Sequence, residues 1–136
     1  MSDSYPSPVK IFILGNGTLL DEGVTHMLVN HSQLSVTRIS YTDDNTLYDL
    51  VNFERPNTIF INESNALDVG HVIGLIFSVP SASVRCVIVV HSENSMLDVY
   101  YRPATRLLVT KYRRKSVVVR TKEEFINLAL TGSGYA

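Results

Sequence analysis

Short apolar runs recur along the whole chain, and they constrain its fold more than any other feature. Val9–Leu14, Asn57–Ile61 and Val84–Val90 are rich in β-branched and aromatic residues and carry few polar ones. Such runs predict strands buried on both faces, as in the middle of a parallel sheet. Leu34–Tyr41 alternates apolar with polar positions and predicts an outer strand, while Arg106–Thr110 predicts a fifth strand.

The segments between these runs change to a helical spacing of apolar residues. Candidate caps precede several of them, and prolines follow three. The predicted helices are Thr18–Asn30; Thr42–Phe53, started by Thr42, Asp43 or Asp44 and closed by Arg55 and Pro56; Ala66–Val79, stopped by Pro80; the short Ser95–Arg102, ended by Pro103; and Thr121–Leu130, capped by Thr121.

Five strands that alternate with helices require a parallel sheet with helices on both faces and right-handed crossovers. At 136 residues, the chain has room for one such domain. The economical α/β arrangement is a doubly wound, flavodoxin-like (CheY-like) sheet of five strands in the order 2-1-3-4-5. We expect it to span residues 9–131, between a disordered arm (1–8) and a short tail (132–136). Ser116–Val119 has the β-propensity for an extra edge strand paired with Arg106–Thr110.

The charge and the cysteine content exclude several classes of protein. The formal net charge is -1, so no overall field attracts the chain to nucleic acid or to anionic lipid. No apolar run approaches the roughly 20 residues of a membrane-spanning helix, and the N-terminus has no signal-peptide pattern. The single cysteine, Cys86, cannot form an internal disulfide, which fits a reducing cytoplasm. We expect a cytoplasmic protein that has no membrane contact.

The functional crevice of a doubly wound sheet lies outside the carboxyl ends of its strands, near the switch in strand order. One of the residues at this edge is an amide, Asn62, in a place where a carboxylate could take part in a reaction. The residues predicted at this edge are Gly15 and Asn16 after the first strand, Asn62 after the third, Val90 and His91 after the fourth, and Lys111 after the fifth.

Four segments carry a resemblance to a known family: "ILGNGTLLDEGVTHML", "RPNTIFINES", "LLVTK" and "TKEEFINLAL". With them, residues 8–131 resemble the receiver domain of bacterial response regulators of the helix-turn-helix (NarL/FixJ, LuxR-type) class. The stretch "RPNTIFINE" is similar to the degenerate receivers of auxiliary capsule and biofilm regulators of enteric bacteria. The resemblance implies a role in two-component signal transduction and transcription regulation.

An active receiver of this family binds Mg²⁺ through an acidic pair after the first strand and an aspartate after the third, which also accepts the phosphoryl group. A hydroxyl after the fourth strand and a lysine after the fifth stabilise that group. The resemblance places the acidic pair at Gly15 and Asn16, the acceptor at Asn62, the hydroxyl at Val90 and the lysine at Lys111.

Four of these five positions have the wrong chemistry for phosphoryl transfer. Asn62 is a poor nucleophile and carries no charge. Gly15 and Asn16 lack the carboxylates that would offset the dehydration of Mg²⁺. Val90 cannot donate a hydrogen bond. The resemblance therefore implies a receiver whose phosphorylation site is degenerate.

Small shifts of the alignment do not restore the site. A shift by one residue brings His91 or Ser92 to the hydroxyl position, but no shift restores both aspartate positions. The aromatic switch position of the fifth strand falls on Leu108. Lys111 keeps the residue type of the family, either in a structural role or as the start of a basic run.

Other candidate sites have simpler explanations. "LGNG" lacks the remaining glycines of a dinucleotide fingerprint and the Lys-Ser/Thr of a P-loop, so a tight turn explains it. No Ser-His-Asp arrangement points to one site. We therefore expect no catalytic residue, no metal and no cofactor. The histidines are scattered without metal-ligand spacing, at His26, His31, His71 and His91.

The segment Thr110–Lys122 is unusually basic. One interpretation is a solvated loop whose charges protect a sheet edge. The other is a contact surface for a partner; direct DNA binding would lack a recognition helix. The residues of this candidate interaction surface are Lys111, Arg113, Arg114, Lys115 and Arg120.

The first functional hypothesis is a phosphorylation-independent pseudo-receiver of a bacterial transcription regulator. It would form a homodimer, or a heterodimer with a response regulator, and would reach DNA only through a helix-turn-helix domain absent from this chain. The chain would then be an excised domain or a stand-alone adaptor. The alternatives are a sensor that binds a small anionic metabolite or nucleotide in the crevice, and an active receiver with displaced acidic residues. The crevice residues of the sensor would be Asn16, Asn62, His91 and Lys111.

Overall fold

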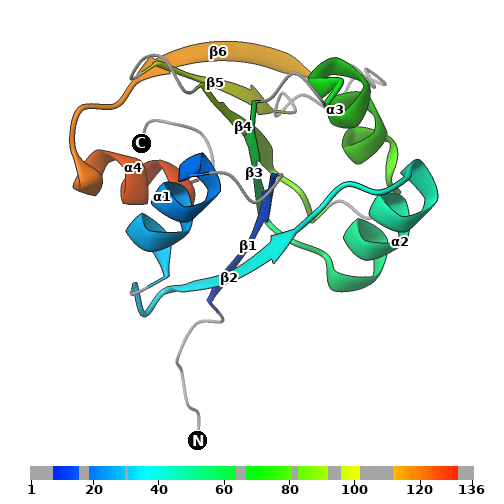
Figure 1. Ribbon diagram of the computed structural model, residues 1–136, viewed down its shortest axis with the longest axis horizontal. Helices are drawn as coiled ribbons and strands as arrows, with labels where there is room; N and C mark the ends of the chain where they lie inside the picture. Colours follow the sequence, from blue (N-terminus) through cyan, green and yellow to red (C-terminus); the bar gives the residue numbers. More distant parts are fainter. Residues whose placement is uncertain are drawn as a thin grey trace, which may run out of the picture.

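The computed structural model describes residues 8–15, 19–29, 31–63, 67–80, 83–91, 96–101 and 112–131. Within them, strands and helices alternate up to the fourth strand, and two further strands precede the last helix (Figure 1). The elements are β1 Val9–Leu14, α1 Leu19–Leu28, β2 Leu34–Ile39, α2 Asp44–Glu54, β3 Thr58–Asn62, α3 Val69–Ser78, β4 Cys86–Val90, β5 Met96–Tyr101, β6 Arg113–Val118 and α4 Lys122–Thr131.

A single sheet forms the middle layer, with the strand order β2-β1-β3-β4-β5-β6. The first four strands in this order are parallel. Helices α1 and α4 cover one face, and α2 and α3 cover the other (Figure 1). The expected α/β class and the flavodoxin-like order of these strands are therefore confirmed.

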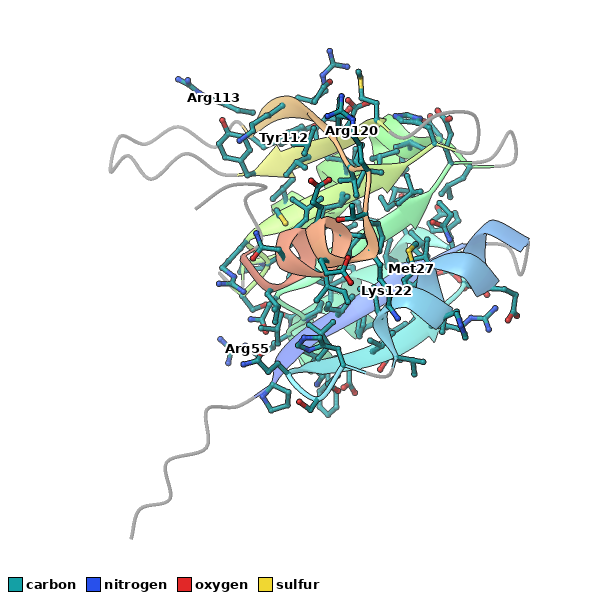
Figure 2. The ribbon with its side chains drawn as sticks, turned by 90° about the vertical axis from the view of Figure 1, so that its left-hand side faces the viewer. Met27, Arg55, Tyr112, Arg113, Arg120 and Lys122 are labelled. Carbon is teal, nitrogen blue, oxygen red and sulfur yellow. The ribbon has the colours of Figure 1, made fainter. Side chains whose placement is uncertain are left out.

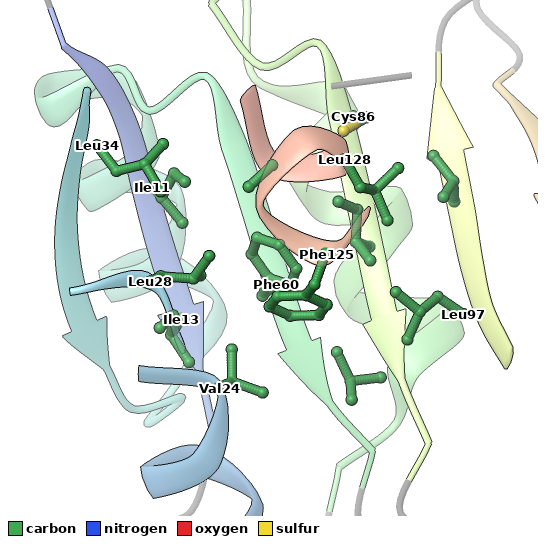
Figure 3. Packing of buried hydrophobic residues seen from close by; sticks show 14 residues of the cluster. Ile11, Ile13, Val24, Leu28, Leu34, Phe60, Cys86, Leu97, Phe125 and Leu128 are labelled. Carbon is green, nitrogen blue, oxygen red and sulfur yellow. The ribbon is translucent and has the colours of Figure 1, made fainter. Parts of the chain in front are cut away.

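Alternate residues of the buried strands point to two apolar layers. On one face, Ile13 of β1 and Phe60 of β3 pack with Leu28 of α1 and Phe125 of α4 (Figure 3). The rings of Phe60 and Phe125 lie 5.1 Å apart, centroid to centroid. On the other face, the neighbouring strand residues pack against α2 and α3; the strands contribute Phe12, Leu14, Ile59 and Ile61, and the helices contribute Leu47, Val51, Val72 and Ile73. Burial on both faces explains why these strands are mostly apolar.

Polar caps fix the starts of three helices. Asp43 caps α2 by accepting a hydrogen bond from the amide of Thr46 at 2.8 Å. Asp68 accepts one from the amide of His71 at the start of α3. The hydroxyl of Thr121 accepts one from the amide of Glu124 at 3.1 Å, as predicted for α4. These contacts satisfy amides that have no partner within the helix.

Beyond β4, the sheet differs from the one that the sequence predicted. Ser95–Arg102 was expected to be a helix, but Met96–Tyr101 forms β5, which is antiparallel to β4. Its burial alternates, with Leu97 and Val99 inside, and this period of two belongs to a strand. The fifth strand of the sheet is thus antiparallel rather than parallel.

The expected extra edge strand is present as β6, Arg113–Val118. It pairs antiparallel with β5; the segment Arg106–Thr110 was predicted as its partner. That segment lies outside the described residues, as do the arm up to residue 7 and the tail from residue 132. In the described part of the chain, no helix is long and apolar enough to cross a membrane.

Candidate functional site

Three of the five expected site positions lie at the carboxyl edge of the parallel strands. Gly15 directly follows β1, is buried, and donates its amide hydrogen to the carbonyl of Ile39 at 3.3 Å. Asn62 is the last residue of β3 and is 3% exposed. The register of β3 and β4 places Asn62 directly beside Val90, which is also buried. Asn16 and Lys111 lie outside the described residues.

These three positions supply a glycine, an amide and an aliphatic side chain. A divalent cation at this edge would need carboxylate oxygens, and none of the three provides one. Asn62 also lacks the nucleophilic oxygen anion that accepts a phosphoryl group. These three positions therefore offer neither a carboxylate ligand for a divalent cation nor a carboxylate nucleophile at this edge.

Beside this edge, His91 bridges two carboxylates. Its Nδ1 lies 2.8 Å from Oε1 of Glu63, and its Nε2 lies 2.9 Å from Oδ2 of Asp98. A neutral imidazole carries only one N–H, so only the doubly protonated ring can donate a hydrogen bond to both carboxylates at once. The hydrogen bond from Glu63 is the largest influence that raises the pKa of His91 above 6.5; burial opposes it, and Asp98 adds to the rise.

The same chain of contacts continues to β6. The hydroxyl of Ser116 donates a hydrogen bond to Oδ1 of Asp98 at 2.8 Å. Burial works to raise the pKa of Asp98, but the hydrogen bonds from His91 and Ser116 and the charges of His91 and Arg114 lower it overall. Glu63, His91, Asp98 and Ser116 therefore connect the end of β3 to β6 across the sheet.

The sequence interpretation missed most of this cluster. It placed His91 at the crevice, but it assigned no role to Glu63, Asp98 or Ser116. Asp98 was missed because its segment was expected to be helical. The alternation of Leu97 and Val99 with polar neighbours is the signal that could have identified the strand.

A second polar cluster joins the starts of α2 and α3. The hydroxyl of Tyr41 donates to Oδ1 of Asp44, and Nε2 of His71 lies 2.8 Å from Oδ2 of Asp44. The hydrogen bond from Tyr41 and then the one from His71 lower the pKa of Asp44. Among the residues that the structure describes, no group of three His, Cys, Asp or Glu side chains is placed to hold a metal ion.

Four residues of the candidate interaction surface lie in or just after β6. Arg113, Arg114 and Arg120 are exposed, and Lys115 is half-buried. Figure 2 shows Arg113 projecting from one end of β6 and Arg120 beyond the other. Arg113, Arg114 and Lys115 of the basic run therefore lie in a strand. The fifth residue, Lys111, lies outside the described residues.

The strand order, the two helical layers and the position of Asn62 define a receiver-like α/β domain. Its fold is similar to a solved structure, the signal receiver domain of a protein from Mycobacterium tuberculosis described as the response regulator NarL. The TM-score is 0.51 at 18% sequence identity, and the match covers 65% of this chain and 70% of that chain. No family model matches the sequence, and no curated protein matches it significantly. The chain has the fold of a response-regulator receiver domain.

Proposed function

We propose that this chain is a pseudo-receiver, a non-enzymatic domain that acts in a bacterial transcription regulator without being phosphorylated. One observation carries the proposal: Asn62, 3% exposed, holds the acceptor place at the end of β3. Its neighbour across the strands is Val90, which offers no hydroxyl to a phosphoryl group. Gly15 supports the same reading, because it brings no carboxylate for Mg²⁺ to the end of β1.

The function left to such a domain is contact with other proteins. The basic strand β6 and Arg120 offer a surface for a homodimer, or for a heterodimer with a response regulator. Exposed arginines support this role, because arginine is enriched at protein interfaces and forms bidentate contacts with carboxylates. In this proposal, DNA contacts belong to a helix-turn-helix domain outside the receiver-like fold.

The geometry of His91 argues against the alternative of an anion sensor. Both ring nitrogens lie within 3 Å of carboxylate oxygens, those of Glu63 and Asp98. A bound anion would have to displace at least one of these carboxylates to reach the imidazolium. A sensor built on His91 is therefore the weaker candidate.

Sedimentation equilibrium tests the proposal on the 136-residue chain, with and without acetyl phosphate and Mg²⁺. We expect the chain to associate to the same extent in both conditions. Changing Arg113→Ala together with Arg114→Ala should weaken association. Arg38→Ala is the matched control, because Arg38 is a partly exposed arginine on β2, at the opposite edge of the sheet. Association that requires acetyl phosphate would contradict the proposal.

A further inference from the structure

The strand β6 is the last strand of the sheet in the described residues, and β5 pairs with one of its two sides. The outer side of an edge strand presents backbone N–H and C=O groups that can pair with another strand. Adding a strand at such an edge is a common way for proteins to associate. The side chains along this edge are accessible, since Arg113, Arg114, Ser116 and Val118 are all exposed.

Symmetry limits how two copies can join at this edge. A twofold axis that continues the sheet stands perpendicular to it, so the two β6 strands run antiparallel. Opposite residues in an antiparallel pair point to the same face, and neighbouring residues point to opposite faces. The axis must therefore pass beside one residue that faces its own counterpart.

The charged side chains of β6 indicate which residue lies beside the twofold axis. An axis at Lys115 would place two lysines directly opposite each other, and an axis at Arg114 would do the same with two arginines. An axis at Val117 would bring Arg114 opposite Arg120 of the other copy. Like charges directly opposite destabilise a strand pair. Each of these three registers is therefore disfavoured.

An axis at Ser116 avoids every such clash within β6. Lys115 then lies opposite Val117, and Arg114 lies opposite Val118 of the other copy. The aliphatic part of an arginine can cover apolar surface while its charged end stays in water. Val118 and its cross-strand neighbour Met96 are 46% and 42% exposed, so both have surface that this arrangement would cover.

We propose that β6 is the docking edge for a second copy of this chain, which adds its own β6 antiparallel about Ser116. The two sheets then become one continuous sheet. This inference rests on the proposed interaction role and names its partner and register. At the centre of the proposed interface, Ser116 donates a hydrogen bond to Asp98 of its own chain, and Asp98 in turn contacts His91.

Single cysteines test this register under mild oxidation. Ser116→Cys should form a disulfide-linked dimer, since the two residues face each other across the axis. Arg114→Cys and Val118→Cys should each form no disulfide-linked dimer when oxidised alone, but a mixture of the two should give a disulfide-linked mixed dimer. Cys86 gives no background, because it is buried and burial raises the pKa of its thiol to about 12.

Sedimentation of the unmodified chain separates failure of this inference from failure of the proposed function. A dimeric chain whose Ser116→Cys variant does not cross-link would overturn the register and place the interface elsewhere. A chain that stays monomeric at all concentrations would overturn the second copy as partner and leave only a heterodimer. As a second variant, Ser116→Lys should abolish dimerisation by opposing two lysines, whereas Ser116→Ala should retain it.

Discussion

Nε2 of His91 lies 2.9 Å from Oδ2 of Asp98, so a residue after β4 is tied to the middle of the antiparallel strand β5. The second ring nitrogen contacts Glu63, which follows β3. The imidazole of His91 thus lies between two carboxylates, beside the carboxyl edge of the parallel strands. This contact places a titratable ring between two negative charges, so the electrostatic interactions at this edge depend on pH.

We predict that the free energy of unfolding falls as pH rises above neutrality. The folded pKa of His91 lies above its ordinary value of 6.5, with the Glu63 hydrogen bond as the main cause. The stabilisation is therefore complete below pH 6.5 and is lost as pH rises through the raised pKa. We expect a loss of about 1 kcal/mol, at the low end for charged hydrogen bonds because Glu63 is half exposed.

Urea unfolding between about pH 6 and about pH 9 measures this effect. The described groups that face His91 are Glu63 and Asp98, with Arg114 acting on Asp98 from β6. His91→Gln cannot titrate, so its stability should change less over this range. A variant with the same pH dependence as the unmodified chain would show that His91 is not the source.

Asn62→Asp should destabilise the fold at neutral pH. The residue is 3% exposed, and an ionised carboxylate there would be buried beside Val90. We expect a loss of about 1–3 kcal/mol in the free energy of unfolding, which shrinks at acid pH as the carboxyl group protonates. Urea denaturation measures both values. Asn127→Asp is the matched control on an exposed position of α4 and should change stability by less than about 0.5 kcal/mol.

The ring pair of Phe60 and Phe125 should anchor α4 to the sheet. Phe125 is 4% exposed and its ring lies 5.1 Å from that of Phe60. Phe125→Ala should lower the free energy of unfolding by about 3–5 kcal/mol, because it leaves a cavity under the helix. Phe53→Ala removes the same side chain from an 82% exposed position of α2 and should cost less than about 0.5 kcal/mol. Equal losses in thermal or urea unfolding would contradict this packing.

Arg55 ends α2 in the left-handed region, with φ 56° and ψ 57°. Its amide donates to the carbonyl of Val51, which closes the helix. Glycine adopts this conformation without a Cβ clash, so Arg55→Gly should stabilise the fold by about 0.5–1 kcal/mol. Arg55→Ala removes the same charge but keeps a Cβ, and it should show no such gain. The comparison of the two variants in urea isolates the backbone effect.

The parallel half of the fold could be predicted because local pattern and burial agree there. The strands around Phe12, Phe60 and Ile88 are buried on both faces, so their sequences are mostly apolar. Asp43 and Thr121 cap their helices as expected, since capping depends on neighbours three residues away. The pattern of residues close together in the sequence was sufficient to predict these strands and helix starts.

The antiparallel half could not be predicted in the same way. Ser95–Arg102 was predicted as a short helix ended by Pro103, while the decisive alternation of Leu97 and Val99 spans only a few residues. The His91 cluster depends on contacts with Glu63, 28 residues away, and with Asp98 on the misassigned strand. Such a cluster becomes visible only when the strand order is known.

We propose that Asn62 is one part of a dismantled phosphorylation site and not a lone substitution in a working one. The most direct test is intact-protein mass measurement after incubation with acetyl phosphate and Mg²⁺. It is applied to the unmodified chain and to Asn62→Asp, which restores only the acceptor. We predict that neither protein gains a phosphoryl group, because a single aspartate lacks the partners that hold Mg²⁺. A stable phosphoryl adduct on either protein would contradict the account.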